Sequence, residues 1–280
     1  MHYTFNMKRY FILSLLLFMT YKASAHQVKQ TFILIHGAWH GAWCWHKVTP
    51  LLTAQNFNVI TIDLPGHGAD TTEPDQVTLS DYVAKVKVIA LQVKGPVILV
   101  GHSMSGVVIS QAAEELGTAK VSKLVYLDAF LPQNGESVSS LARLIESSLP
   151  GDSSRLTIAN GLIIAENHKT STFKPEIADQ LFYNDCSLAD KAFAHKRLSK
   201  QALAPLGTPV SVSNAVYGVI PKYYILCTNS KDLDKTLLPT RVKCKKVYTL
   251  YSGHSPFFSM PKKLVALLSD IAKDNPNSFH

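Results

Sequence analysis

The sequence is poor in cysteine, and its few cysteines follow no metal-binding pattern. Cys44, Cys186, Cys227 and Cys244 form no CxxC pair and no Cys/His spacing of the kind that binds zinc. Cys44 and Cys227 lie in apolar segments, where free buried thiols are expected. The sequence does not define a disulfide pairing. If one pair forms, we expect it to join Cys186 and Cys244.

The sequence also lacks an apolar run long enough to span a bilayer as a helix. Near the N-terminus, basic Lys8 and Arg9 precede a short apolar stretch at residues 11–19, and small residues then lead to Ala25. This order is typical of a cleavable export signal. We therefore expect removal of residues 1–25 and a secreted or periplasmic protein, with an uncleaved N-terminal anchor as the alternative.

Acidic side chains are outnumbered, 20 against 28 Lys and Arg, which gives a formal net charge of +8. Much of this excess is spread along the chain. One short basic cluster stands out, and it consists of Arg241, Lys243, Lys245 and Lys246. Because no aromatic residues interleave with it, we interpret it as a solvated surface and expect no nucleic-acid partner. A small molecule is the expected binding partner.

Apolar strand-like runs alternate with helical patterns in two parts of the chain, at residues 26–132 and 222–280. This alternation predicts an α/β fold, a mostly parallel, doubly wound sheet with helices on both faces. Between the two parts, residues 133–221 lose the alternation and contain short helical pieces among Gly, Pro and Ser. We expect this segment to be a small inserted cap over the C-terminal ends of the strands.

One predicted strand ends in a pattern that presents a reactive serine. The apolar run at residues 97–100 leads to Gly101, and Ser103 follows, with Ser105 two residues further on and a predicted helix behind it. Small residues on both sides of a serine permit the sharp strand-to-helix turn called a nucleophile elbow. Ser103 is therefore the candidate nucleophile, and Ser105 departs slightly from the usual glycine.

A serine hydroxyl needs a base, and a histidine base needs a carboxylate to orient it. His254 follows the last predicted strand and is the candidate base. Three aspartates compete for the carboxylate. Asp234 and Asp232 follow the strand that ends near Thr228, and Asp128 ends the preceding strand. We prefer Asp234 and keep Asp232 and Asp128 as alternatives.

Two backbone amides are candidates for an oxyanion hole. One is Met104, directly after the nucleophile, and the other is Ala38, in the loop after the first strand. His36 and His40 flank Ala38, but the glutamate of a helical HExxH zinc site is missing between them. We expect no metal and no cofactor.

These blocks together resemble a branch of the α/β-hydrolases that holds plant methyl-ester esterases, hydroxynitrile lyases and bacterial carboxylesterases. The resemblance is carried by residues 32–43, 101–106, 126–132 and 253–257, and by Tyr183-Asn184-Asp185-Cys186 in the cap. It implies an α/β-hydrolase fold, a Ser-Asp-His triad, no cofactor and a small lid over an apolar pocket.

The chain departs from this family in the place of its acid. The family acid commonly lies two or three residues after the threonine that ends its strand, whereas Asp234 lies six after Thr228. Counting back from the following proline favours Asp234.

The resemblance leaves more than one activity open. Family lyases carry threonine or asparagine at the position of Gly37, and one type has lysine after its histidine, where this chain has Ser255. Both residues favour hydrolysis of small, fairly apolar carboxylic esters through an acyl-enzyme. Cyanohydrin cleavage, lactone or amide hydrolysis, and non-enzymatic binding of an apolar ligand are the alternatives.

Overall fold

The protein is built on a single six-stranded sheet in which all strands are parallel. The computed structural model describes residues 29–148 and 155–274. In sheet order the strands are β2 (Asn58–Ile62), β1 (Thr31–Ile35), β3 (Val97–His102), β4 (Val121–Leu127), β8 (Lys222–Cys227) and β9 (Lys246–Leu250). The predicted α/β class and parallel sheet are therefore confirmed.

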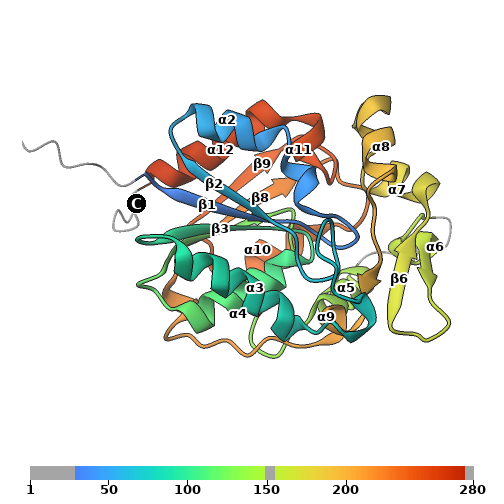
Figure 1. The fold of residues 1–280 in the computed structure, drawn as a ribbon, viewed down its shortest axis with the longest axis horizontal. Coiled ribbons are helices and arrows are strands. Elements are labelled where there is room, and N and C mark those ends of the chain that lie inside the picture. Colours follow the sequence, from blue (N-terminus) through green and yellow to red (C-terminus); the bar gives the residue numbers. More distant parts are fainter. Residues whose placement is uncertain (1–28, 149–154, 275–280) are drawn as a thin grey trace, which may run out of the picture.

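Helices cover both faces of this sheet (Figure 1). On one face lie α3 (Leu79–Gln92) and α4 (Ser105–Leu116), and on the other α2 (Val48–Ala54) and α12 (Pro261–Lys273). Thr78 caps α3, because its side chain accepts from the Asp81 amide while the Asp81 side chain accepts from the Thr78 amide.

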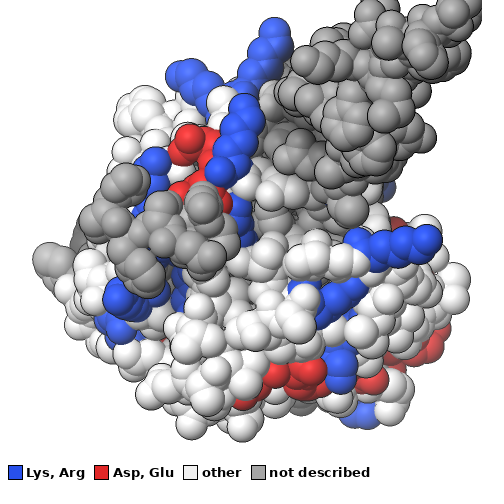
Figure 2. All heavy atoms as spheres, turned by 90° about the vertical axis from the view of Figure 1, so that its left-hand side faces the viewer, with Lys and Arg blue, Asp and Glu red and all other residues white. Residues whose placement is uncertain are grey.

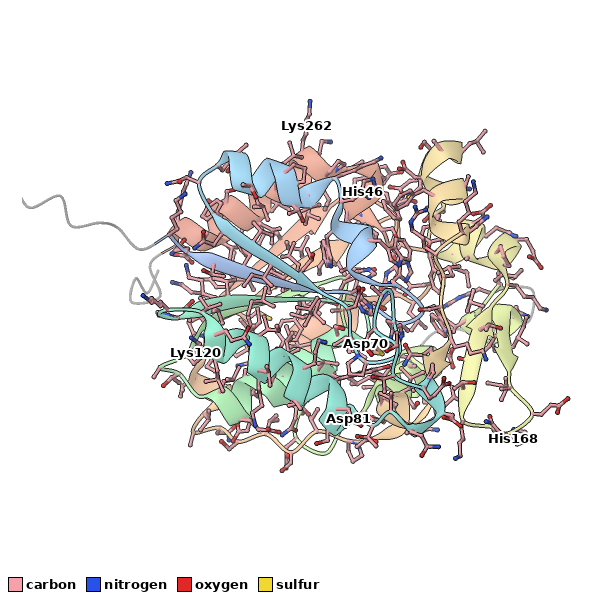
Figure 3. All side chains as sticks on the ribbon, viewed as in Figure 1. His46, Asp70, Asp81, Lys120, His168 and Lys262 are labelled. Carbon is pink, nitrogen blue, oxygen red and sulfur yellow. The ribbon has the colours of Figure 1, made fainter. Side chains whose placement is uncertain are left out.

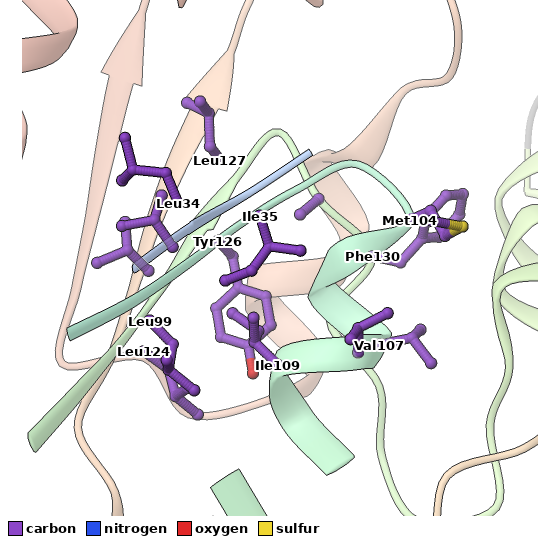
Figure 4. Close-up of a cluster of buried hydrophobic side chains, with 14 of the residues drawn as sticks. Leu34, Ile35, Leu99, Met104, Val107, Ile109, Leu124, Tyr126, Leu127 and Phe130 are labelled. Atoms are coloured by element: carbon purple, nitrogen blue, oxygen red, sulfur yellow. The ribbon is translucent and has the colours of Figure 1, made fainter. Parts of the chain in front are cut away.

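The core lies between the sheet and these helices. All five residues of β1 and all six of β3 are buried. Leu34, Leu99 and Leu127 from the strands and Val107 and Ile109 from α4 belong to one buried apolar cluster (Figure 4). Strands buried on both faces must be apolar throughout, which explains why these runs do not alternate with polar residues.

Of the segment predicted as a cap, 133–221, the described residues 158–202 lie to the right of the sheet in Figure 1. Their three short strands form a separate antiparallel sheet in the order β5-β6-β7, which the sequence patterns did not predict. The elements are α5 (Val138–Ser147), α6 (Ile158–Gly161), β5 (Leu162–Ile164), β6 (Thr170–Phe173), α7 (Pro175–Leu181), α8 (Leu188–His195), β7 (Gln201–Ala202), α9 (Ala204–Gly207) and η3 (Tyr217–Val219).

Short helical turns complete the loops at the ends of the strands. They are η1 (Ala42–Trp45), η2 (Pro74–Gln76), η4 (Lys235–Leu237), α10 (Leu238–Arg241) and α11 (Pro256–Ser259). Within the described residues, no helix is both long and apolar enough to cross a bilayer. The proposed export signal, residues 1–25, lies outside the described residues.

Most of the basic cluster is paired with acids. Lys246 and Lys245 form ion pairs with Asp270 and Asp274, each at 3.2 Å, and Arg241 forms an ion pair with Glu136. In Figure 2, Lys and Arg side chains stand apart over the visible face, with Asp and Glu among them. This arrangement agrees with a solvated surface. All four cysteines are free thiols, so the structure does not contain the Cys186–Cys244 bond considered above.

One glycine of the core tests the packing of α4 against the end of β4. A Cβ on Gly106 would lie 1.9 Å from the Phe130 carbonyl oxygen, which belongs to rigid backbone. We predict that Gly106→Ala lowers the free energy of unfolding by about 1–3 kcal/mol or more, as overpacking does. Urea unfolding measures this change.

Gly207→Ala is the matched control, because a Cβ there meets no atom within 4 Å and Gly207 does not have a positive φ. We expect its stability to equal or slightly exceed that of the wild type. Equal stability of the Gly106 and Gly207 variants would contradict the packing described here.

Candidate active site

Ser103 occupies a strained turn between β3 and α4. Its φ is 53°, a left-handed conformation that non-glycine residues seldom adopt. The backbone around it is held by hydrogen bonds, since the Ser103 carbonyl accepts from the Phe130 amide at 3.0 Å. A Cβ on Gly101 would lie 2.5 Å from the Ser105 carbonyl oxygen, so the turn requires glycine there. The Ser105 hydroxyl donates to the His36 carbonyl. This geometry is that of a nucleophile elbow.

His254 lies next to this elbow, in the loop after β9. The ring of His102, the residue before Ser103, packs on the His254 ring with centroids 4.5 Å apart. His102 Nε2 also donates to the His254 carbonyl oxygen at 2.9 Å. Burial lowers the pKa of His102 well below its usual value, so this ring stays neutral and serves as packing. The structure thus packs His254 against His102, the residue that directly precedes Ser103.

The carboxylate that contacts His254 is Asp128. Asp128 Oδ2 lies 2.6 Å from His254 Nδ1, and both side chains are almost completely buried. Asp128 follows the last residue of β4 and has a φ of 43°. Its other oxygen, Oδ1, accepts from the Cys227 amide at 3.3 Å. This contact fixes the His254 ring with Nδ1 toward the carboxylate, and leaves Nε2 for a substrate or nucleophile.

Asp234 does not contact His254, and the preference for it is therefore corrected. Asp234 is exposed, and its carboxylate caps η4 by accepting from the Thr236 amide at 3.0 Å and the Thr236 hydroxyl at 2.7 Å. It lines a cavity of about 430 Å³ together with residues such as Gln180 and Leu181 of the cap segment. A residue at the solvated start of a helical turn satisfies the turn's amides and is not free to reach a buried imidazole.

A second aspartate and a lysine complete a buried cluster behind His254. Lys235 Nζ lies 2.7 Å from Asp232 Oδ2 and 3.2 Å from Asp128 Oδ2. Ser230 Oγ lies 2.9 Å from Asp128 and 2.7 Å from Asp232, and its single proton serves one carboxylate at a time. Asp232 Oδ2 is 3.5 Å from His254 Nδ1.

The charges of this cluster stabilise one another. Burial alone would raise the pKa of Asp128, but the Lys235 ammonium, the His254 contact and the Ser230 hydroxyl lower it to about 2. Burial acts to lower the pKa of Lys235, and the two carboxylates overcome it and raise that pKa above its usual value. Both groups are therefore ionised at neutral pH.

Asp128, Asp232 and His254 place three possible ligand atoms within 4.8 Å of one another. The Lys235 ammonium already supplies the positive charge between the two carboxylates, so the group is an ion-pair cluster rather than a metal site. His36 and His40 are equally unsuited to hold a metal. Both ring nitrogens of each are engaged, those of His36 with Gly37 and Leu64, and those of His40 with Ala38 and Tyr183.

The loop after β1 lies directly against the elbow. A Cβ on Gly37 would come within 2.9 Å of Ser103 Cβ and 2.8 Å of His102 Nδ1, so only glycine fits. The predicted oxyanion-hole donors are the backbone amides of Ala38 and Met104. They belong to the residues that directly follow Gly37 and Ser103. Neither amide donates a hydrogen bond to another group of the described chain. The Met104 amide also belongs to the start of α4, where the helix dipole favours negative charge.

The cap segment is tied to the loop that carries His254. Asp185 Oδ2 accepts from the Gly253 amide at 2.7 Å and from the Ser252 hydroxyl at 3.1 Å. Asn184 Nδ2 donates to the Asn229 carbonyl at 3.0 Å, in the loop after β8. The Tyr183-Asn184-Asp185-Cys186 stretch therefore serves as the connection between the cap and the site.

Sequence reasoning missed Lys235 and Ser230 as parts of the site. The signal for Lys235 was its position three residues after Asp232, close enough along the loop before η4 for the two charges to pair. For Ser230 no pattern was available, because a serine in a polar loop is common.

Comparisons with known proteins identify the family to which this chain belongs. The model of the alpha/beta hydrolase family matches residues 32–267. A putative chloroplastic methylesterase 11 of Arabidopsis thaliana is 34% identical over 255 residues, which cover 88% of this chain and 64% of the relative. Methyl jasmonate esterase 1 of Vitis vinifera is 30% identical over 86% of this chain and 96% of its own.

A solved structure has the same fold. The methylesterase MES16 from Arabidopsis superposes with a TM-score of 0.75 at 25% identity, covering 87% of this chain and 98% of that one. The chain therefore belongs to the α/β-hydrolase family, as its resemblance implied. This chain spans less than two thirds, 64%, of the length of the Arabidopsis thaliana relative and 96% of the Vitis vinifera one.

The contact between Asp128 and His254 makes a prediction for Ser103 reactivity. In Asp128→Asn, the amide no longer selects the imidazole tautomer that accepts the serine proton. We predict that the rate of Ser103 labelling by a fluorophosphonate probe falls by a factor on the order of 10³–10⁴.

Asp234→Asn is the control. We expect its labelling rate to match the wild type and its stability to change little, since asparagine also caps helical turns. Loss of labelling in the Asp234 variant with full labelling in the Asp128 variant would restore the original assignment.

Proposed function

We propose that the protein is a serine carboxylesterase that cleaves small, fairly apolar esters through an acyl-enzyme. Ser103 is the nucleophile, His254 the general base and Asp128 the acid of the triad. The observation that carries this proposal is the 2.6 Å contact between Asp128 and His254 beside the strained Ser103 turn. The relatives described above, a putative methylesterase and a methyl jasmonate esterase, support an ester substrate.

In the first step, His254 Nε2 takes the Ser103 proton while Ser103 Oγ attacks the ester carbonyl carbon. The imidazole becomes positively charged in this step, and the ionised Asp128 stabilises that charge. Because the pKa of Asp128 is about 2, its carboxylate remains charged throughout the neutral range. Asp128 does not need to accept the proton itself.

The carbonyl oxygen becomes an oxyanion in the tetrahedral intermediate. The Ala38 and Met104 amides are the proposed donors, and both are free of other partners in the described chain. The ring of His40 supports the Ala38 peptide, since its Nδ1 donates to the Ala38 carbonyl at 2.7 Å. Burial lowers the pKa of His40 to about 4, which keeps this ring neutral. Such preorganised donors commonly account for a factor of about 10²–10³ each.

Collapse of the intermediate completes the acylation. The imidazolium of His254 gives its proton to the leaving alkoxide, the alcohol departs, and the acyl group stays on Ser103 Oγ. A water molecule then repeats the sequence, with His254 as base, and releases the acid. Ser103 regains its proton, so the cycle consumes one water for each ester.

Aromatic side chains around the site favour an apolar substrate. Trp39 stacks on Phe182 with ring centroids 5.8 Å apart and lies 4.9 Å from the Phe173 ring. Phe182 also packs 5.7 Å from the His254 ring. Trp39 and these two cap phenylalanines are buried and present apolar ring surfaces. An ester bound beside them would contact apolar side chains.

We further propose that the mature protein begins after Ala25 and is secreted or periplasmic. The support is the order of basic, apolar and small residues at the N-terminus. N-terminal sequencing of protein recovered outside the cytoplasm gives residue 26 as the first residue if this proposal holds. Retention of the leader in the cell would contradict it.

The proposed nucleophile yields a direct prediction. Ser103→Ala removes the only atom that forms the acyl-enzyme, and we expect kcat for p-nitrophenyl acetate to fall by a factor on the order of 10⁶. Fluorophosphonate labelling is lost as well. Ser122→Ala, at the far end of β4, is the control and keeps both signals.

The test also separates the alternatives. Full ester hydrolysis by Ser103→Ala would refute the proposed nucleophile. Release of cyanide from mandelonitrile by the wild type, without ester turnover, would identify a lyase.

A further inference from the structure

Lys235 is a buried lysine whose charge lies between two buried carboxylates. Only 1% of its surface is exposed, and its ammonium bonds Asp232 at 2.7 and 2.8 Å and Asp128 at 3.2 Å. A buried ammonium is costly unless carboxylates surround it in this way. The arrangement links the start of η4 to the ends of β4 and β8.

The charges near His254 are balanced by this lysine. Two carboxylates lie within 3.5 Å of His254 Nδ1, Asp128 at 2.6 Å and Asp232 at 3.5 Å. With Lys235 present, one buried ammonium faces both carboxylates and offsets the charge of one of them. Without it, two adjacent negative charges would lie beside the imidazole in a place from which water is largely excluded.

We propose that Lys235 is a positioning residue that sets the protonation of His254 by neutralising one of the two carboxylates beside it. The inference rests on the proposed esterase function and adds a group that does not touch the substrate. Lys235 acts through Asp128, which it holds ionised and directed at His254 Nδ1. Asp232 is the counterpart that this charge neutralises.

The other groups around the cluster do not replace this lysine. His102 and Cys227 face it from β3 and β8, Tyr224 from β8, and Asp185 from the cap segment. Burial keeps His102 neutral, and it raises the pKa values of Cys227 and Tyr224, so these two also stay uncharged. Asp185 is a carboxyl group that accepts from the Gly253 amide and cannot supply positive charge. Lys235 is therefore the cation of the described residues that faces Asp128 and Asp232 together.

The sign of the effect follows from the balance. His254 must be neutral to accept the Ser103 proton. Loss of the Lys235 ammonium leaves excess negative charge beside His254, and this charge favours the protonated imidazolium. The neutral imidazole that acts as base is then present only at higher pH. Loss of the Asp232 charge has the opposite effect, because Asp128 and Lys235 then cancel.

The experiment compares Lys235→Met, Asp232→Asn and the double variant with the wild type. For each folded variant, kcat, KM and the acidic limb of kcat/KM against pH are measured with p-nitrophenyl acetate. We expect Lys235→Met to lower kcat by about 10- to 100-fold with little change in KM, and to move the acidic limb up by about one pH unit. We expect Asp232→Asn to move the acidic limb of kcat/KM to lower pH.

The double variant restores the charge balance and is the decisive member of the set. We expect its acidic limb to return close to that of the wild type, and its kcat to exceed that of Lys235→Met. If Lys235→Met does not fold, Asp232→Asn and the double variant still carry the test. Lys262→Met is the control, since Lys262 projects from α12 into solvent, away from the site (Figure 3).

Two results would overturn the inference. One is a Lys235→Met protein with the kcat and pH profile of the wild type. The other is a shift of the limb in the same direction for Asp232→Asn and the double variant. Loss of wild-type activity in Ser103→Ala, measured in parallel, keeps the esterase proposal intact in either case. A wild type that hydrolyses no ester would instead end the esterase proposal.

Discussion

The site depends on one charged hydrogen bond, that between Asp128 and His254 in the buried interior behind Ser103. Removing a carboxylate from water is unfavourable, and the protein offsets this cost with an ammonium, a hydroxyl and a backbone amide around Asp128. The imidazole is the remaining partner. The buried Asp128 carboxylate orients the His254 ring and also stabilises its protonated form. One contact therefore serves both the fold and the proposed chemistry.

The parallel sheet makes this arrangement possible. The C-terminal ends of parallel strands meet at one edge, and Ser103, Asp128 and His254 follow β3, β4 and β9 at that edge. β4 and β8 are neighbours whose residues pair up to Leu127 and Ile225. A carboxylate at the end of either strand can therefore reach the same imidazole. In this chain Ser230, two residues after Thr228, hydrogen-bonds the acid that β4 supplies.

The sequence predicted the sheet, the elbow and His254 because each has a local pattern: buried apolar runs, small residues around Ser103, and a histidine after the last strand. The sequence did not identify which aspartate contacts His254. Three aspartates follow neighbouring strand ends, and the directions of their side chains depend on packing between the strands. Asp234 was preferred by its distance from a proline, which carries no information on burial. The antiparallel sheet of the cap was missed because its strands have only two to four residues.

A crystal structure of the protein with a phosphonate bound covalently to Ser103 tests the central claim most directly. The account predicts a phosphonate oxygen within hydrogen-bond distance of the Ala38 and Met104 amides, His254 Nε2 facing the leaving-group side, and Asp128 still on Nδ1. An adduct in which His254 Nδ1 pairs with another group, or in which the oxygen points away from both amides, would contradict it.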